Sequence, residues 1–161
     1  MSVFTPVTPE QLSAWLKNYS IGALLVLEGI PAGIENTNYF VTTTHGRYVL
    51  TLFEKLEAEQ LPFYLDLMAH LARHGIPCPQ PIADRDHGYS GQLNGKPASI
   101  FTCLPGADLK QVTAGQCATI GSLLARMHLA GASYRLQMPN PRGPAGWHAA
   151  ALQLQPLLDT A

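Results

Sequence analysis

The segment between Gly29 and Asn38 holds the residues of this sequence that are best suited to binding an anion. It reads GIPAGIENTN, with Gly33 in its middle and Asn36 near its end. Glycines allow backbone N–H groups to approach a phosphate and asparagine side chains add donors, whereas Glu35 would repel it unless its side chain points away. Gly and Asn are also ordinary turn residues. The residues alone therefore leave two interpretations open: a lid over a phosphate-bearing ligand, or a plain turn at the edge of a sheet.

Cysteine usage argues against a disulfide framework and against a zinc site. The three cysteines, Cys78, Cys103 and Cys117, are odd in number and show no Cys-x-x-Cys spacing. We expect no metal site, and we expect Cys103 to be a small core residue rather than a reactive thiol. His128 lies on the apolar face of a helical segment, so we expect it to be a structural core residue.

The elements that would position these residues begin with a helix and a strand. Thr8, Pro9 and Gln11 have the spacing of an N-cap, a first-turn proline and a capping box, which predicts a helix over 9–18. A strand is predicted over 23–29. The Gly- and Pro-containing segment after it is predicted to be a loop, because it breaks the strand pattern.

A β-hairpin and a second helix are predicted next. Two runs rich in β-branched and aromatic residues, 38–44 and 47–54, flank His45-Gly46, and this pattern predicts a hairpin. A 3.6-residue apolar period followed by a glycine C-cap predicts a helix over 59–75.

An extended link, further strands and further helices complete the prediction. Prolines exclude a helix over 76–82, and Asn94-Gly95 is a type I′ hairpin signal within a segment of two or three strands. The apolar stretch 98–104 is predicted to be a central strand. An apolar helical period predicts a helix over 114–131.

Composition is typical of one globular domain with a core. The 161 residues are 47% hydrophobic and 13% charged, with a net charge of −1. Ten basic residues balance eleven acidic ones without clustering, which gives no indication of a nucleic-acid partner. The start has no signal-peptide pattern, and the longest apolar run is far too short to span a bilayer. We therefore expect a cytoplasmic protein with no membrane partner.

Four stretches together resemble a known family. They are GIENTNYFVTTTHGRYVLTLFEK (33–55), LPFYLDLMAHLARHGIPCPQPI (61–82), GKPASIFTCLPG (95–106) and IGSLLARMHLAG (120–131). In this order and spacing they resemble the N-terminal half of bacterial homoserine kinases, within the aminoglycoside/choline kinase-like (protein-kinase-like) superfamily.

This resemblance implies an α+β fold with two parts. Residues 1–104 would form a protein-kinase-like N-lobe, with a five- or six-stranded antiparallel sheet and one main helix. Residues 105–161 would form a hinge and the first helices of an incomplete helical C-lobe. The implied activity is phosphorylation of the L-homoserine hydroxyl in threonine biosynthesis, with ATP and Mg²⁺.

The resemblance also implies where a nucleotide would bind. A loop over the ATP phosphates, a third-strand position and a hinge strand that contacts the adenine edge through its main chain would build the site. The implied residues are Gly29, Gly33, Asn36, Asn38, Thr51, Thr102, Cys103 and Leu104. The hinge stretch can equally be read as an ordinary core strand.

Two positions depart from the family pattern. Thr51 stands where a Lys or Arg usually clamps the α- and β-phosphates, so it supplies a hydrogen bond but no charge. Phe63 and Tyr64 stand where a helix glutamate would pair with that cation. The absence of both members of the ion pair is self-consistent, because one buried charge without its partner would be costly. Lys55 lies four residues beyond Thr51 and, by strand parity, on the same face, although a solvated strand-end lysine is the more ordinary interpretation.

The acidic residues that phosphoryl transfer requires are missing from the sequence. None of the three His-Gly pairs, at His45, His74 and His87, is followed by Asp, and no Asp-Phe-Gly occurs. The family places these residues in its helical second lobe, so we expect neither a catalytic residue nor a Mg²⁺ ligand here. We expect a truncated form that is inactive alone and self-associates through apolar helices. A non-catalytic nucleotide- or partner-binding fragment, or a kinase for another small alcohol such as choline or an aminoglycoside, stays open.

Overall fold

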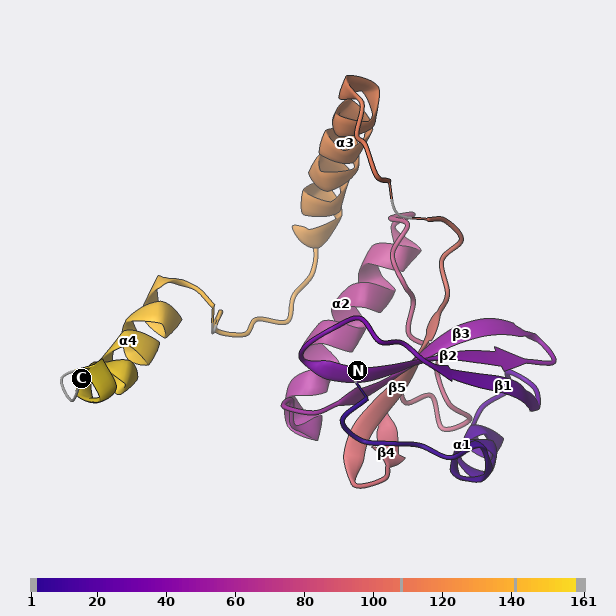
Figure 1. Cartoon of the computed structure of the whole chain (residues 1–161). Helices are drawn as coiled ribbons and strands as arrows, with labels where there is room; N and C mark the ends of the chain where they lie inside the picture. Colours follow the sequence, from indigo (N-terminus) through magenta and orange to yellow (C-terminus); the bar gives the residue numbers. More distant parts are fainter. Residues whose placement is uncertain (1–2, 108, 141, 159–161) are drawn as a thin grey trace.

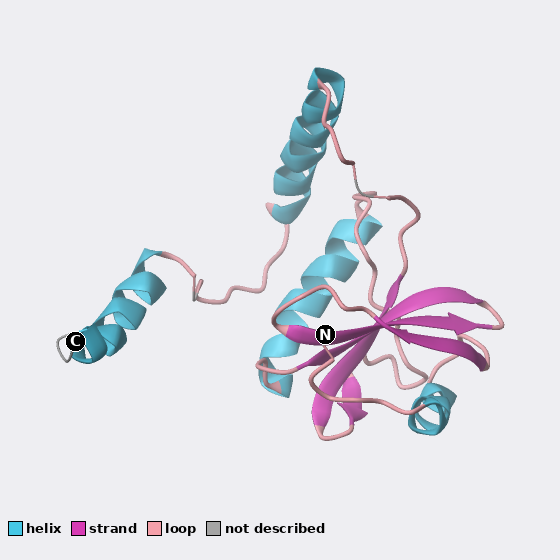
Figure 2. Ribbon diagram, in the orientation of Figure 1, coloured by secondary structure: helices cyan, strands magenta, loops and turns pink. Residues whose placement is uncertain are grey.

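A five-stranded antiparallel sheet forms the centre of the N-terminal part of the chain (Figure 1, Figure 2). The computed structural model describes residues 3–107, 109–140 and 142–158. In spatial order the strands are β1 (Leu24–Gly29), β2 (Asn36–Thr43), β3 (Gly46–Phe53), β5 (Lys96–Thr102) and β4 (Gly91–Leu93). The predicted sheet is thus confirmed with five strands. The strand predicted over 98–104 is internal as expected, but it ends at Thr102.

Alternation along β2 divides the sheet into two faces. Thr37, Tyr39 and Val41 are buried, whereas Asn36 and Asn38 between them are only partly buried. Side chains of successive strand residues point to opposite faces. The two asparagines therefore share a face that is not the one carrying the main core.

Each face of the sheet packs against its own helix. The main core lies on the face covered by α1 (Pro9–Trp15) and includes Leu12, Leu50 and Ile100, all fully buried. The opposite face packs against α2 (Leu61–Arg73) through a smaller cluster of Phe53, Leu61, Leu65 and Phe101. This second layer has less apolar packing, and it leaves room beside α2 for a cavity.

The N-terminal helix forms as its capping signals predict. The Gln11 backbone N–H donates to Thr8 Oγ1 at 3.3 Å, and the Thr8 N–H donates to Gln11 Oε1 at 2.8 Å, so the capping box is complete. The α-helix ends at Trp15 and continues as a 3₁₀ turn, Leu16–Asn18. The helix predicted over 9–18 covers both parts.

The β2–β3 hairpin turns one residue earlier than the sequence predicts. Thr43 pairs with Gly46, so Thr44 and His45 form the turn and Gly46 begins β3. This shift moves every cross-strand partner by two positions and places Asn38 opposite Thr51.

The other predicted hairpin is confirmed at its turn. Asn94 and Gly95, between β4 and β5, have φ values of 51° and 75°. Positive φ at both central residues is what a type I′ turn requires.

Hydrogen bonds to the buried Thr37 side chain fasten the segment before α1 to the sheet. The backbone N–H groups of Phe4 and Thr5 both donate to Thr37 Oγ1, at 2.9 and 3.1 Å. Thr37 in turn donates to Glu54 Oε1 at 2.7 Å, and Lys96 pairs with Glu54 Oε2 at 3.3 Å. Burial raises the pKa of Glu54, but the hydrogen bonds from Thr37, Thr5 and Lys96 outweigh it and lower that pKa overall.

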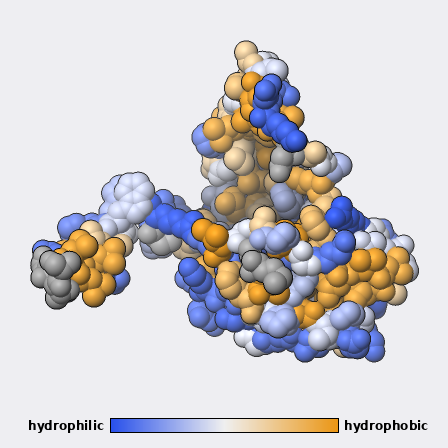
Figure 3. All heavy atoms as spheres, in the orientation of Figure 1, coloured by the Kyte–Doolittle hydropathy of each residue, from blue (hydrophilic) through white to orange (hydrophobic). Residues whose placement is uncertain are grey.

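Two helices follow the sheet, and neither has a buried side chain among the residues described. The first, α3 (Ala114–Gly131), has the predicted bounds and is N-capped by Thr113. The second, α4 (Pro144–Leu158), lies apart from the sheet at the end of an extended linker (Figure 1). Hydrophobic atoms gather over α4 and along α3 (Figure 3), and Ile120 is 61% exposed. The expectation of exposed apolar helices is confirmed.

Candidate functional site

A cavity of about 330 Å³ lies between the sheet face that carries Asn36 and Asn38 and the end of β5. Six of the eight predicted site residues line it. They are Asn36, Asn38, Thr51, Thr102, Cys103 and Leu104. The wall is mainly apolar, with a few polar groups, as small-molecule sites commonly are. We refer to this cavity as the cleft.

The two remaining predicted residues, Gly29 and Gly33, are not among the residues that line the cleft. Gly29 ends β1, and a Cβ there would come within 3.1 Å of Val3, so this glycine makes room for the N-terminal segment. Gly33 has φ +114°, a conformation that side chains disfavour, and it adjoins the Asn38 amide. Gly33 thus shapes the loop that precedes the cleft.

A hydrogen bond between the two central strands fixes the polar part of the cleft wall. Thr51 Oγ1 donates to Asn38 Oδ1 at 2.8 Å. The Asn38 amide nitrogen is 3.4 Å from the Asn36 carbonyl oxygen. Thr51 therefore orients the Asn38 amide, with the amide N–H groups toward Asn36, and adds no positive charge to the cleft.

The end of β5 and the two residues after it, Cys103 and Leu104, also line the cleft. The Thr102 N–H already donates to the Gln80 carbonyl oxygen at 2.9 Å, and the Gln80 N–H donates to Thr102 Oγ1. The backbone N–H of Thr102 is therefore already paired within the fold. Cys103 is partly exposed here and is not the core residue that the sequence suggested.

Apolar residues complete the cleft, and the sequence reasoning did not single them out. Val49 and Phe53 lie on the Thr51 face of β3, Met68 comes from α2, and Phe101 comes from β5. Strand parity from Thr51 would have found the first two. The contribution of α2 depends on how that helix crosses the sheet, which no local pattern specifies.

The positions expected to carry a helix glutamate are aromatic and packed. The rings of Phe63 and Tyr64 meet edge to face at 5.3 Å, and the Phe63 carbonyl oxygen accepts a hydrogen bond from the Tyr134 hydroxyl at 2.7 Å. Burial, followed by the charge of Asp66, raises the pKa of Tyr134. These residues hold the linker after α3 against α2.

Histidines take structural positions that differ from the expectation. His128 is exposed on α3 and is not in the core. The sequence also contains one pair, His70 and His74, with the i, i+4 spacing of helical metal ligands. Their rings lie 4.2 Å apart, but His70 Nε2 is 2.9 Å from the Ala130 carbonyl oxygen and His74 Nδ1 contacts the His70 carbonyl. Across the residues that the structure describes, no three His, Cys, Asp or Glu side chains gather as metal ligands.

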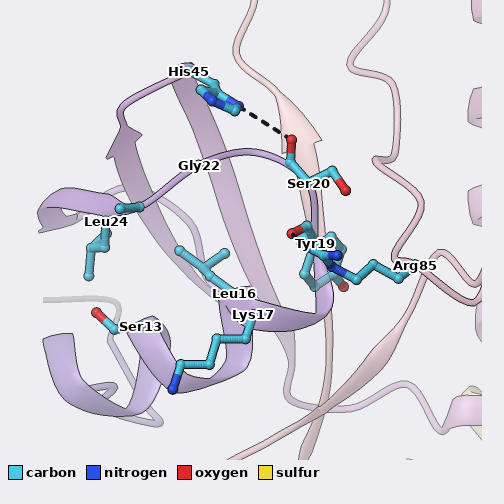
Figure 4. A pocket seen from close by; sticks show the side chains of 10 residues that line it. Ser13, Leu16, Lys17, Tyr19, Ser20, Gly22, Leu24, His45 and Arg85 are labelled. Carbon is cyan, nitrogen blue, oxygen red and sulfur yellow. Dashed lines mark hydrogen bonds between the residues drawn. The ribbon is translucent and has the colours of Figure 1, made fainter.

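A larger cavity, of about 590 Å³, lies elsewhere and contains none of the predicted site residues (Figure 4). It is bounded by the end of α1, the start of β1 and the hairpin turn. His45 Nδ1 is 3.4 Å from the Ser20 carbonyl oxygen, and Arg85 Nη2 donates to the Tyr19 carbonyl oxygen at 3.4 Å. Burial, then the charge of Asp84, raises the pKa of Tyr19, whose buried hydroxyl has no hydrogen-bond partner among the described residues.

The arrangement of sheet, α2 and cleft is that of a protein-kinase-like N-lobe. Two solved kinases share this fold at low sequence identity. Spectinomycin phosphotransferase, solved with ADP and spectinomycin, matches 94% of this chain and 47% of its own with a TM-score of 0.65 and 17% identity. Amicoumacin kinase, solved with AMP-PNP, Ca²⁺ and Ami, matches 70% of this chain and 36% of its own with a TM-score of 0.58 and 19% identity.

The chain belongs to the phosphotransferase enzyme family, whose model matches residues 26–161. Among the relatives that the chain matches, the homoserine kinase of Methylobacillus flagellatus is 55% identical over 159 residues, which is 99% of this chain and 50% of that protein. The homoserine kinase of Burkholderia thailandensis is 49% identical over 158 residues, 98% of this chain and 48% of its own. The chain thus spans about half the length of these relatives. No helix in the described part of the chain is long and apolar enough to cross a membrane.

Proposed function

We propose that the cleft binds the adenosine end of ATP, and that this chain is the nucleotide-binding half of a kinase that phosphorylates the hydroxyl of L-homoserine. The observation that carries the proposal is the convergence of six residues from three separate segments on one cavity. Val49, Met68 and Phe101 offer apolar surface to a flat base, and the backbone of Cys103 and Leu104 offers donors and acceptors to its edge.

Homoserine is the proposed substrate because relatives near 50% identity over almost the whole chain carry that name. The spectinomycin and amicoumacin kinases, at 17% and 19% identity, support the fold alone. They give no comparable support to an aminoglycoside or to choline. We assign residues 1–104 to the N-lobe and 105–161 to the hinge and the start of a helical lobe, so the substrate would contact mainly the part of the relatives that this chain does not span.

The 161 residues alone are proposed to bind nucleotide without turning it over. Phosphoryl transfer needs carboxylates that orient the acceptor hydroxyl and hold Mg²⁺. The described residues do not fit a Mg²⁺ site, since they form no cluster of acidic or other metal-ligating side chains. We therefore assign the metal to the part of the relatives beyond this chain and derive no step through it.

The test is to incubate the purified chain with Mg-ATP and L-homoserine, to follow ADP release, and to measure ATP binding by calorimetry in parallel. Binding without turnover is the expected result. Turnover that is lost when Asn36 and Asn38 are replaced by alanine would contradict the proposal that the chain is inactive alone. A folded chain that binds no adenine nucleotide would overturn the proposal itself.

Val49→Phe, which extends a side chain into the cleft, should abolish nucleotide binding. Leu25→Phe is the matched control, because Leu25 is 61% exposed on β1 and does not line the cleft.

A further inference from the structure

We propose that a second cavity beside the cleft binds the phosphate groups of the nucleotide, with Lys55 and Arg142 as its cations and Glu35 as a displaceable counter-ion. The inference extends the proposed function, since it assigns the phosphate end of the same ligand. It supplies the positive charge that Thr51 lacks.

The second cavity continues from the cleft through a shared residue. It has a volume of about 420 Å³, and Asn36 lines both cavities. Lys55 and Leu56 follow β3, Tyr64 comes from α2, and the remaining wall is formed by Glu35 and by the linker before α4. A ligand whose flat end occupies the apolar cleft would reach this polar cavity by passing Asn36.

Other cations around the hairpin are already engaged. Lys96 pairs with Glu54 at 3.3 Å and also donates to the Glu54 carbonyl oxygen at 3.2 Å. The Arg47 guanidinium lies 4.1 Å above the Phe40 ring. Lys55, in contrast, has no hydrogen bond or ion pair within the described part of the chain, and it lines the cavity. Strand parity along β3 predicts that Lys55 lies on the same face as Thr51, but β3 ends at Phe53. Lys55 therefore lines the second cavity and not the cleft.

Arg142 reaches this cavity from far along the sequence. It forms an ion pair with Glu35, a residue 107 positions away on the loop before β2. The Arg142 backbone N–H donates to Asn140 Oδ1 at 3.0 Å, which orders the turn that presents the guanidinium. Arg142 thus neutralises Glu35, the acidic residue of the loop before β2 that would otherwise repel a phosphate.

The ion pair between Arg142 and Glu35 is weak enough for a bound phosphate group to replace Glu35. The side chains of Arg142 and Glu35 are 74% and 46% exposed, and exposed ion pairs contribute little to stability. A phosphate group carries more charge than a carboxylate and accepts two parallel hydrogen bonds from a guanidinium. Arg142 would therefore leave Glu35 for a polyphosphate, with Lys55 contacting it as a point charge.

Three substitutions and three probes test the proposal in the 161-residue chain. The variants are Lys55→Gln, Arg142→Gln and Glu35→Gln, and the probes are ATP against adenosine, with inorganic tripolyphosphate as a probe without a base. Arg135→Gln is the matched control, because Arg135 is an exposed cation of the same linker that does not line the cavity. Circular dichroism checks that each variant is folded.

Loss of either cation should weaken ATP and tripolyphosphate binding about tenfold, the scale of one charge-assisted contact, and leave adenosine binding unchanged. Glu35→Gln should strengthen binding of both phosphate probes, because it removes the competing carboxylate. Tripolyphosphate binding at the wild-type level in both cation variants would overturn the proposal, as would equal losses for ATP and adenosine.

The outcome for adenosine separates this proposal from the function on which it rests. If adenosine does not bind but tripolyphosphate binding still depends on Arg142, the nucleotide assignment of the cleft fails and the anion site stands. If adenosine binds at the cleft and phosphate groups add no Arg142-dependent affinity, the anion site fails and the cleft assignment stands.

Discussion

Replacing Thr51 by valine should loosen the polar wall of the cleft while preserving its shape. Thr51 is 7% exposed, and its hydroxyl donates to Asn38 Oδ1 at 2.8 Å across the β2–β3 pair. Valine has nearly the same volume and a high preference for strands. The variant therefore removes one hydrogen bond with little change in packing.

The expected cost follows from the burial of both partners. A net intramolecular hydrogen bond contributes about 1 kcal/mol, and more when the abandoned partner stays unpaired in the interior. Asn38 is only partly buried, so water can reach its carbonyl oxygen, and the lower figure applies. With a urea m-value of about 2 kcal/mol/M, a loss of about 1 kcal/mol lowers the unfolding midpoint by about 0.5 M.

Urea unfolding followed by circular dichroism measures this shift, and adenosine titration measures its effect on the cleft. Thr51→Ser retains the hydroxyl and should recover most of the difference. Thr42→Val on β2 is the matched control, because no side-chain hydrogen bond of Thr42 occurs within the described residues; it should change the free energy of unfolding by less than about 0.5 kcal/mol. If Thr51→Val shifts the midpoint no more than Thr42→Val does, the hydrogen bond does not hold the cleft wall.

Three further changes probe the rest of the structure. Glu54→Gln should make the free energy of unfolding depend less on pH under acidic conditions. The pKa of Glu54 is lowered from 4.5, so the stability that its carboxylate contributes is present above that value and is lost as pH falls through the lowered pKa. Urea unfolding midpoints between pH 6 and 3 measure the difference. Thr37→Val should cost about 1–3 kcal/mol of unfolding free energy, because it leaves the Glu54 carboxylate and two backbone N–H groups short of a partner. Ile120→Glu should reduce self-association in analytical ultracentrifugation, since Ile120 is 61% exposed on α3, and an unchanged sedimentation profile would contradict a role for that helix.

Local sequence signals specified most of the elements but not the hairpin register. Thr8 and Gln11 form the predicted capping box, and Asn94-Gly95 forms the predicted turn, because each signal acts within a few residues. At the other hairpin, His45-Gly46 and Thr44-His45 are neighbouring alternatives for the turn. Tyr39 and Val41 face the core in either register. The structure pairs Thr43 with Gly46, with the His45 N–H donating to Thr43 Oγ1 at 3.1 Å, and this register places Asn38 opposite Thr51.

Long-range contacts account for what the sequence could not predict about the candidate site. The side chain of Glu35 has an ion-pair partner 107 residues away, so no local pattern could indicate its direction. Met68 enters the cleft through the crossing of α2 over the sheet, which depends on the whole Phe53–Leu65–Phe101 cluster. The exposure of His128 also depends on long-range contacts. An apolar helix face is buried only where another element covers it, and α3 has no buried side chain among the described residues.

The most direct test of the central claim is to map adenosine onto the chain by NMR. Amide and methyl chemical shifts should change at Val49, Thr51, Met68 and Leu104, which line the cleft, and Val49→Phe should remove those changes. Shift changes centred on the larger cavity, at residues such as Leu16, or no shift changes in a folded chain, would contradict the assignment of the cleft as the nucleotide site.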